Sequence, residues 1–321
     1  MITRRVAVGA GAAASLAGGA LAQGVQPTLG PIRAVTTTAA DLRAVEAAYS
    51  RFLGYRVVHR GRVPAQTARI WGAPAVAGRG LLIMAPEAGE PTLLRFVEQA
   101  MPADFKPMTT LGWNSTEIIV QDCDAVARRL ADSPFRIVGP PKNLDGSGDI
   151  RAMQAIGPAN EMLYLTATTR PMPGRDMPTA EAFIGRCFIA VLAGRDIAGM
   201  SDFYRASFGR ETGPTFTSRI LSLSAQQGVS PETRYDLAVV QLGGGTKLEL
   251  DAYPPTSGPR PRPAGGLPLG MAMVSFECSD LARHAAHMAA PPRPAQIGPF
   301  RGRRTGVVAG PAGELIELIQ V

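Results

Sequence analysis

The chain carries one pattern twice, and this duplication constrains its fold more than any other feature. Residues 40–58 read ADLRAVEAAYSRFLGYRVV, and residues 195–213 read RDIAGMSDFYRASFGRETG. The second residue of each copy is acidic (Asp41, Asp196). An apolar stretch at helical spacing follows, with a tyrosine in its middle (Tyr49, Tyr204), and then an aromatic residue and a glycine. Each copy therefore predicts an amphipathic helix at the same place in a repeated unit.

A second pair of matching segments closes the two copies. GPANEMLYL spans residues 157–165, and GPAGELIEL spans residues 310–318. From the opening acidic residue (Asp41 or Asp196) to this Gly-Pro pair there are 116 positions in the first copy and 114 in the second. Two copies that stay in register over this distance predict a duplicated domain.

Length and composition fit two globular domains. The chain has 321 residues, of which 45% are hydrophobic and 18% charged, so it can bury a core. Its net charge of +7 would favour a nucleic-acid partner. The charge comes almost entirely from scattered arginines, however, and no basic stripe is interleaved with aromatic residues. We therefore expect no nucleic-acid partner.

Residues 1–22 read as an export signal. Arg4 and Arg5 precede a weakly apolar run over 6–21, and Ala20-Leu21-Ala22 matches a signal cleavage site. The paired arginines resemble a twin-arginine signal. A transmembrane anchor is the alternative, but the run is shorter than the roughly 18 residues that a span needs. We expect an exported, periplasmic protein without a stable membrane anchor.

The three cysteines give no metal or disulfide framework. Cys123, Cys187 and Cys278 are far apart, and none belongs to a CxxC pair. We expect them to be buried and to act as small hydrophobic residues.

Strand and helix signals predict four β-α-β-β-β units. In the first unit, a strand over 32–38 precedes the helix over 41–53, and further strands follow at 55–59, 80–85 and 92–98. The second unit has a strand at 112–121, a helix at 122–130 and strands near 136–138, 151–156 and 161–166.

The pattern then restarts after a linker rich in proline and charge. We expect a first module at 30–169, the linker at 170–183 and a second module at 184–321. The predicted fold class is α+β. Each of two tandem modules pairs two units into a curled eight-stranded sheet around a pocket.

These paired units, their Asp-initiated helices and their GPxxE endings resemble the vicinal oxygen chelate superfamily. It includes glyoxalase I, extradiol dioxygenases and bleomycin-resistance proteins. The resemblance covers residues 32–321. It implies a small organic ligand in a pocket of each module and leaves a homo-oligomer open. Since members include enzymes and simple binders, the fold alone does not give the function.

The resemblance also implies four metal-ligand positions in each module, usually two histidines and two glutamates. In the first module, the matching residues are Ala34, Arg95, Ser115 and Tyr164. In the second module, they are Ile189, Glu249, Met273 and Glu317. Every imidazole is missing, and His and carboxylate donors are what such an ion needs. We therefore expect no metal and no other cofactor.

The first pocket is the predicted catalytic site. The period-two alternation of strands places Glu117 on the same face as Ser115. We expect Arg95 to bind a carboxylate or enolate oxygen, Glu117 to move a proton and Tyr164 to donate a hydrogen bond. The alternative is a structural ion pair between Arg95 and Glu117. Further residues are expected to contact the ligand: Trp113, Asn114 and Ser115 at the pocket and Trp71 as a lid. The alternative for Trp71 is a place in the core.

The predicted second pocket holds Glu249 and Glu317, which would approach each other across the sheet. Close carboxylates share a proton, which raises one pKa and suits acid–base chemistry. The alternative is that an arginine neutralises them: Arg219, Arg303 or Arg304.

Three functions follow. The leading hypothesis is a metal-independent lyase or isomerase that acts next to a carbonyl group. The second is a non-catalytic binding or sequestering protein of the resistance type. The third is a metal-dependent lyase or dioxygenase with a rearranged site.

Overall fold

The computed structural model describes residues 26–321, except 90, 145–146, 171 and 173–175. The predicted export signal at 1–22 lies outside the described residues. Within the described part of the chain, no helix is both long and apolar enough to cross a membrane.

The first two β-α-β-β-β units are present where the sequence predicts them. The first consists of β1 (Leu29–Ala39), α1 (Leu42–Leu53), β2 (Arg56–Arg62), β3 (Gly80–Ala85) and β4 (Leu93–Glu98), with α2 (Ala65–Ile70) and the 3₁₀ helix η1 (Pro74–Val76) inserted after β2. The second consists of β5 (Gly112–Val120), α3 (Cys123–Leu130), β6 (Arg136–Leu144), β7 (Ser147–Ile156) and β8 (Met162–Thr168).

The other two units repeat this order. The third consists of β9 (Ile184–Gly194), α4 (Ile197–Phe208), β10 (Phe216–Arg219), α5 (Leu221–Gln227), β11 (Arg234–Gly243) and β12 (Thr246–Ala252). The fourth consists of β13 (Met271–Cys278), η2 (Ala282–His287), β14 (Arg293–Pro294), η3 (Gly298–Phe300), β15 (Arg304–Ala309) and β16 (Leu315–Gln320). Helices α2 and α5 occupy equivalent places, and neither was predicted from the sequence.

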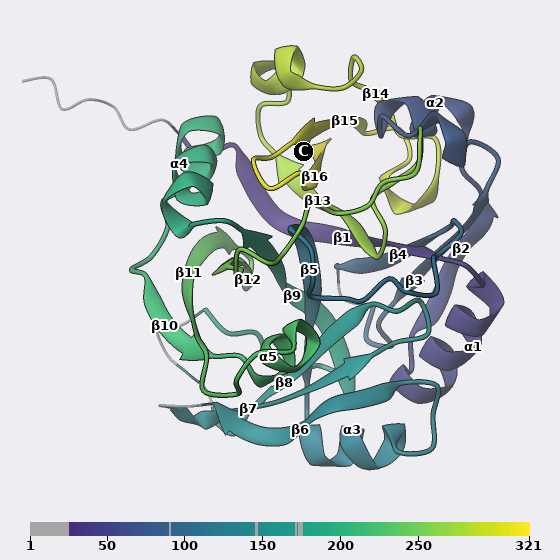
Figure 1. The fold of residues 1–321 in the computed structure, drawn as a ribbon. Helices are drawn as coiled ribbons and strands as arrows, with labels where there is room; N and C mark the ends of the chain where they lie inside the picture. Colours follow the sequence, from purple (N-terminus) through teal and green to yellow (C-terminus); the bar gives the residue numbers. More distant parts are fainter. Residues whose placement is uncertain (1–25, 90, 145–146, 171, 173–175) are drawn as a thin grey trace, which may run out of the picture.

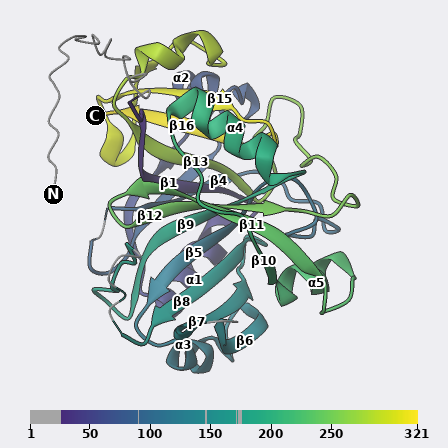
Figure 2. The same cartoon turned by 90° about the vertical axis from the view of Figure 1, so that its left-hand side faces the viewer.

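The strands form two curled eight-stranded sheets, which confirms the predicted fold class (Figure 1). The first sheet has the order β14-β15-β16-β13-β1-β4-β3-β2, and the second has β10-β11-β12-β9-β5-β8-β7-β6. Figure 2 shows the first sheet above the second. Unit one therefore shares a sheet with unit four, and unit two shares one with unit three. The expectation that units adjacent in the chain share a sheet was wrong.

The repeated sequence motif explains why α1 and α4 begin and end where they do. The side chain of Asp41 accepts hydrogen bonds from the backbone N–H groups of Arg43 and Ala44, which caps the helix N-terminus. Gly54 ends α1 with a φ of 71°, a left-handed conformation that glycine adopts without a steric penalty. In α4, Asp196 and Gly209 play the same two parts.

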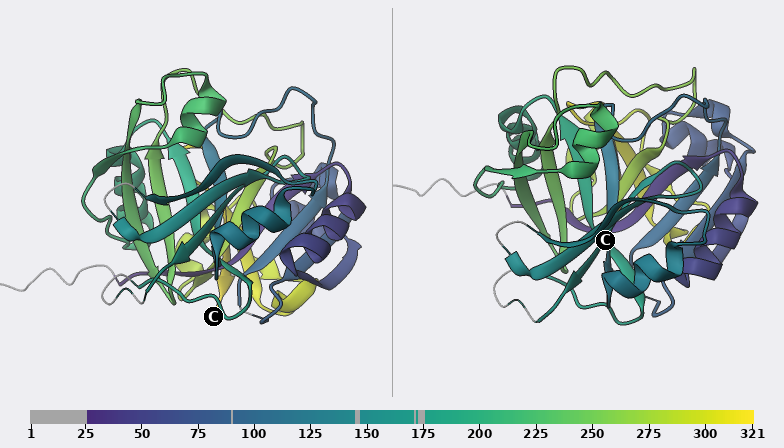
Figure 3. Two further views of the ribbon diagram at one scale, coloured as in Figure 1. Left: turned by 90° about the horizontal axis from the view of Figure 1, so that it is seen from below. Right: turned by 60° about the horizontal axis from the view of Figure 1, so that its bottom comes forward.

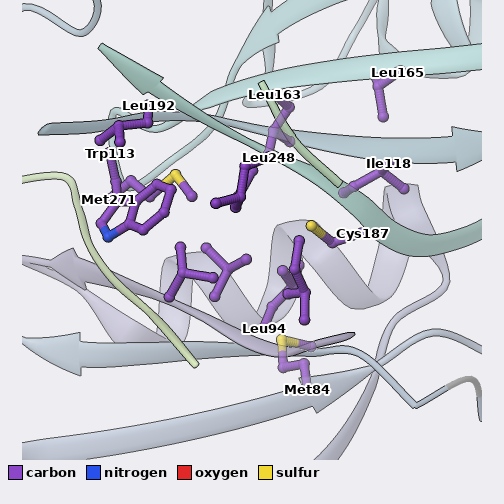
Figure 4. Close-up of a cluster of buried hydrophobic side chains, with 14 of the residues drawn as sticks. Met84, Leu94, Trp113, Ile118, Leu163, Leu165, Cys187, Leu192, Leu248 and Met271 are labelled. Carbon is purple, nitrogen blue, oxygen red and sulfur yellow. The ribbon is translucent and has the colours of Figure 1, made fainter. Parts of the chain in front are cut away.

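The main core lies between the convex faces of the two sheets. Figure 4 shows side chains from both sheets meeting there, among them Met84 and Leu94 from the first and Leu163 and Leu248 from the second. Helices α1 and α3 lie on the outside of the curled sheets (Figure 3) and add their apolar faces to this core. The cysteines are free and buried, as predicted: Cys123, Cys187 and Cys278.

Each concave face has a separate cluster of buried side chains. Residues of α2 and both halves of the first sheet form one cluster, and residues of α5 and the second sheet form another. Because successive side chains in a strand alternate between faces, these clusters contain the positions at which the sequence predicts a site.

Candidate functional site

A buried ion pair lies on the concave face of the first sheet. Arg95 on β4 and Glu317 on β16 are only 4% and 3% exposed, and Nη2 of Arg95 lies 2.8 Å from Oε2 of Glu317. Nε of Arg95 donates to Oγ1 of Thr36 at 2.8 Å. Ser275 on β13 donates its hydroxyl to the same oxygen of Glu317 that Arg95 contacts.

Trp71 completes this network. Its indole N–H donates to Oε1 of Glu317 at 2.8 Å, and the guanidinium carbon of Arg95 lies 4.6 Å from the centre of a Trp71 ring. Both carboxylate oxygens of Glu317 therefore have donors, and the cation is stacked on an aromatic face.

The electrostatics of Glu317 fit a structural role. Burial alone would raise the pKa of its carboxyl group, but the charge of Arg95 and the hydrogen bonds from Ser275, Trp71 and Arg95 outweigh burial and lower the pKa. The carboxylate is ionised, paired and fully satisfied. The side chains of this network fill the concave face. Neither carboxylate oxygen of Glu317 is left free to take part in a reaction.

The concave face of the second sheet is organised differently. Glu117 on β5 is paired in register with Tyr164 on β8, and on its other side with Ile189 on β9. One level along the sheet, Ser115 lies next to Val191. The sequence-predicted residues Glu117, Ser115 and Tyr164 are therefore neighbours on one sheet.

Strand β12 brings two more carboxyl groups to this face. Glu249 and Asp251 are two residues apart, so they point to the same side of the strand. Glu249 is half-buried and Asp251 is fully buried. Their carboxyl groups are close enough to perturb each other's pKa. Since two ionised carboxylates repel each other at short range, this proximity favours a proton on one of them.

The pKa values of this acidic cluster are raised. Burial raises the pKa of Asp251 to about 8, and the charge of Glu117 adds to that rise. Burial and the neighbouring carboxyl groups also raise the pKa of Glu249. Burial raises the pKa of Glu117 to about 7, although a hydrogen bond from Thr166 at 2.6 Å and the charge of Lys247 lower it in part. Near neutral pH, Glu117 is thus divided between its two protonation states.

Tyrosines and serines surround these acids. The hydroxyl of Tyr164 lies 3.3 Å from Oγ of Ser222 on α5, and Oγ of Ser224 lies 3.0 Å from the hydroxyl of Tyr235. Burial, and then the nearby carboxyl charges, raise the pKa of Tyr164 well above its usual range. Its phenol therefore stays protonated and able to donate.

Several buried polar atoms of this face have no hydrogen-bond donor or acceptor among the described residues. They are Oγ of Ser115, the hydroxyl of Tyr253 and both carboxylate oxygens of Asp251. Native proteins seldom leave buried polar groups unpaired, and each case needs an explanation. A ligand on this face would provide one.

The two sheets thus separate residues that the sequence analysis grouped together. Arg95 lies on the first sheet, so it shares no pocket with Glu117, and the alternative Arg95–Glu117 ion pair was also wrong. The predicted approach of Glu249 to Glu317 was wrong for the same reason. Arg95, and none of the three arginines considered, neutralises Glu317.

Three of the predicted ligand contacts have other roles. Trp71 is fixed on Glu317 and is not a lid over a ligand. Trp113 is 1% exposed in the core between the sheets, where its indole N–H donates to the carbonyl oxygen of Leu315 at 2.7 Å. Asn114 is also buried, and its amide donates to the carbonyls of Thr110 and Gly112.

The sequence analysis missed Asp251, Tyr253 and Lys247. All three share the strand alternation of Glu249, since they are two or four residues away from it. The signal was therefore available in the sequence KLELDAY at 247–253.

Comparison with known proteins rests on structure alone. No family model matches the chain, and no curated protein matches it in sequence. Glyoxalase I from Zea mays is similar in structure, with a TM-score of 0.59 and 14% identity over 90% of this chain and 92% of that enzyme. A putative dioxygenase from Bacillus subtilis subsp. subtilis str. 168 also has a TM-score of 0.59, with 14% identity over 92% of this chain and 86% of that protein.

The chain therefore has the same fold as these two proteins, as the resemblance to the vicinal oxygen chelate superfamily implied.

The residues at the superfamily's metal positions do not fit a metal ion. The first sheet offers Ala34, Arg95, Met273 and Glu317, and the second offers Ser115, Tyr164, Ile189 and Glu249. Each sheet thus supplies one carboxylate and no imidazole, and the carboxylate of the first is engaged by a guanidinium. Within the described ranges, no three His, Cys, Asp or Glu side chains are placed to hold an ion.

Proposed function

We propose that the protein binds a small, partly apolar organic molecule on the concave face of the second sheet and moves a proton next to its carbonyl group. The reaction class is that of a metal-independent lyase or isomerase. One observation carries the proposal: unpaired buried polar atoms lie beside carboxyl groups with raised pKa values on this face. Perturbed acids gather at functional sites because proton transfer needs pKa values near the working pH.

Each group has a defined part in such a step. Ionised Glu117 takes the proton from the carbon next to the carbonyl, and the C–H electron pair moves toward the carbonyl oxygen, which becomes an enolate. The phenol of Tyr164 donates a hydrogen bond to that oxygen. A proton held by Glu249 or Asp251 then returns to carbon in an isomerase, or goes to the leaving group in a lyase. No oxidant or reductant is needed.

The apolar part of the ligand would lie against Ile189, Val191 and Met162. These side chains share the concave face with the acidic cluster. A mostly apolar lining with a few placed polar groups is typical of small-molecule sites.

Proton exchange tests this proposal. The protein is incubated in D₂O with a panel of ketones, 2-hydroxyketones and 1,3-dicarbonyl compounds, and loss of the acidic C–H signal is followed by proton NMR. We expect faster exchange with at least one compound, and a loss of about a hundredfold or more in Glu117→Gln. The matched control is Glu161→Gln, because Glu161 is also buried with a pKa of about 7 but belongs to the β7–β8 turn.

The pH dependence adds a second readout. The rate should rise through a pH of about 7 as Glu117 ionises, and fall above about 8 as the Glu249–Asp251 pair loses its proton. Ligand binding without exchange would favour the sequestering function. Exchange that survives Glu117→Gln would contradict the assigned base.

A further inference from the structure

A groove lined by arginines lies outside both concave faces. It runs between α2 and the segment that carries β14 and η3, and it has a volume of about 970 Å³. We call it the arginine groove and define it by Arg69, Arg293 and Arg301 together with the apolar residues Ile70 and Ala295. It is separate from the acidic cluster, which belongs to the other sheet.

The positive charges of the three guanidinium groups in the groove are not balanced by an acidic partner among the described residues. All three arginines are exposed, and none of them forms an ion pair or a side-chain hydrogen bond with another described residue. None of the described residues that line the groove is acidic. Arg303 and Arg304, next along the chain, are also exposed and unpaired within the same described part. Like charges gathered on one side create a positive potential that attracts anions.

The groove also has a fixed, apolar floor. Ile70 is buried in the first concave cluster, and the next residue, Trp71, is held by Glu317 beneath it. The side-chain amide of Gln66 on α2 donates to the carbonyl oxygen of Pro294 on β14 at 3.2 Å, which joins the two walls. The volume lies within the range of roughly 300–1,000 Å³ that is typical of small-molecule sites.

We propose that the arginine groove binds an amphiphilic organic anion. A carboxylate or phosphate group would be held by the guanidinium groups, whose planar donors match both anions, and an apolar body would lie on Ile70 and Ala295. The site is independent of the proposed proton transfer on the second sheet. Either can fail without the other.

Calorimetric titration at low ionic strength tests the site with defined probes. Phenyl phosphate and phthalate represent the phosphate and carboxylate sources, and inorganic phosphate and phenol carry the charge and the ring alone. We expect phenyl phosphate, phthalate or both to bind at least about tenfold more tightly than inorganic phosphate or phenol. Binding should weaken as salt is added.

Matched double variants locate the binding. Arg69→Ala with Arg301→Ala should weaken binding of the tighter probe by about tenfold or more. Arg43→Ala with Arg128→Ala removes the same charge from exposed positions on α1 and α3, and should leave binding unchanged. Equal weakening in both double variants, or no binding of either organic probe, would overturn the proposal. Thermal unfolding should be alike in all proteins, since all four arginines are exposed.

Discussion

At the residue scale, equivalent carboxyl groups have opposite environments on the two sheets. Glu317 and Glu249 occupy corresponding positions in units four and three. Glu317 receives a guanidinium, an indole N–H and a hydroxyl. Glu249 is placed instead beside Asp251. The first carboxyl group is therefore held ionised as part of the fold, whereas burial and neighbouring carboxyl groups raise the pKa of the second.

Replacing Arg95 tests the structural role of the ion pair. Arg95→Ala leaves the buried Glu317 carboxylate without its cation, so the free energy of unfolding should fall by about 3–5 kcal/mol. The double variant Arg95→Met, Glu317→Leu removes both charges and should recover most of that loss. Urea unfolding of the three proteins measures both effects. A single variant as stable as the wild type would contradict this role.

The buried acids predict that the protein loses stability as the pH rises. Burial raises the pKa of Glu117, Glu161 and Glu314 to about 7 and that of Asp251 to about 8. The folded state therefore holds protons that the unfolded chain releases at lower pH, so this stabilisation is complete below about 4 and is lost as the pH rises through 7 to 8. The free energy of unfolding should be at least about 2 kcal/mol lower at pH 8.5 than at pH 5.5.

Urea unfolding at these two pH values checks that prediction, with Glu161→Gln as the comparison. This variant has no titrating group at position 161, so its stability should change less with pH. Stability that rises between pH 5.5 and 8.5 would show that the acids are not buried as described.

At the element scale, the repeated motif has a physical explanation. The hydroxyl of Tyr49, in the middle of α1, donates to Oε1 of Glu161 in the turn before β8 at 2.6 Å. In the second copy, the hydroxyl of Tyr204 in α4 lies 3.5 Å from Oε1 of Glu314 before β16. The helix tyrosine and the GPxxE turn thus recur at matching positions in both copies because the tyrosine hydroxyl is hydrogen-bonded to the glutamate of the turn. Each bond joins two units that belong to different sheets.

Removing these hydroxyl groups should have unequal effects. Tyr49→Phe leaves a buried carboxyl group without its donor and should lower the free energy of unfolding by about 1–3 kcal/mol. Tyr204→Phe removes a longer contact, while Glu314 still accepts from the backbone N–H of Ala312 at 2.9 Å, so its loss should be about 1 kcal/mol or less. Chemical unfolding of both variants measures the difference. A larger loss in Tyr204→Phe would contradict the explanation.

At the scale of the whole molecule, the sequence predicted the units but not their partners. Periodicity located each β-α-β-β-β unit, since it reports which face of a strand or helix is buried. In every unit, the first strand lies at the centre of its sheet and pairs with the first strand of another unit: β1 joins β13, and β5 joins β9. No local sequence feature distinguishes a sheet formed by two adjacent units from a sheet formed by the first and the last unit.

That ambiguity accounts for what the sequence analysis missed at the site. Glu117, Ser115 and Tyr164 were correctly grouped because they belong to one unit. Arg95 was placed with them because its unit is adjacent in the chain, and its true partner, Glu317, is 222 residues away. Local alternation could have added Asp251 to the acidic cluster. It could not have shown how deeply these carboxyl groups are buried, which is the main cause of their raised pKa values.

Export remains a prediction about the whole chain. Fused to a reporter protein, residues 1–30 should direct export, and Arg4→Lys with Arg5→Lys should block it, since a twin-arginine signal requires the pair. Cell fractionation of both fusions measures this. Unchanged export of the double variant would remove the twin-arginine interpretation, and retention of the unaltered fusion in the cytoplasm would remove export itself.

Native mass spectrometry of the protein, purified from the cells that naturally make it, tests most directly whether the second sheet holds the ligand site. We expect a bound small organic molecule in the wild type and in the double variant Arg95→Met, Glu317→Leu, because the Arg95–Glu317 ion pair belongs to the first sheet and not to the proposed site. The same molecule should be absent from Glu249→Gln, Asp251→Asn, which alters the acidic cluster. A ligand kept by the second double variant and lost from the first would contradict the account.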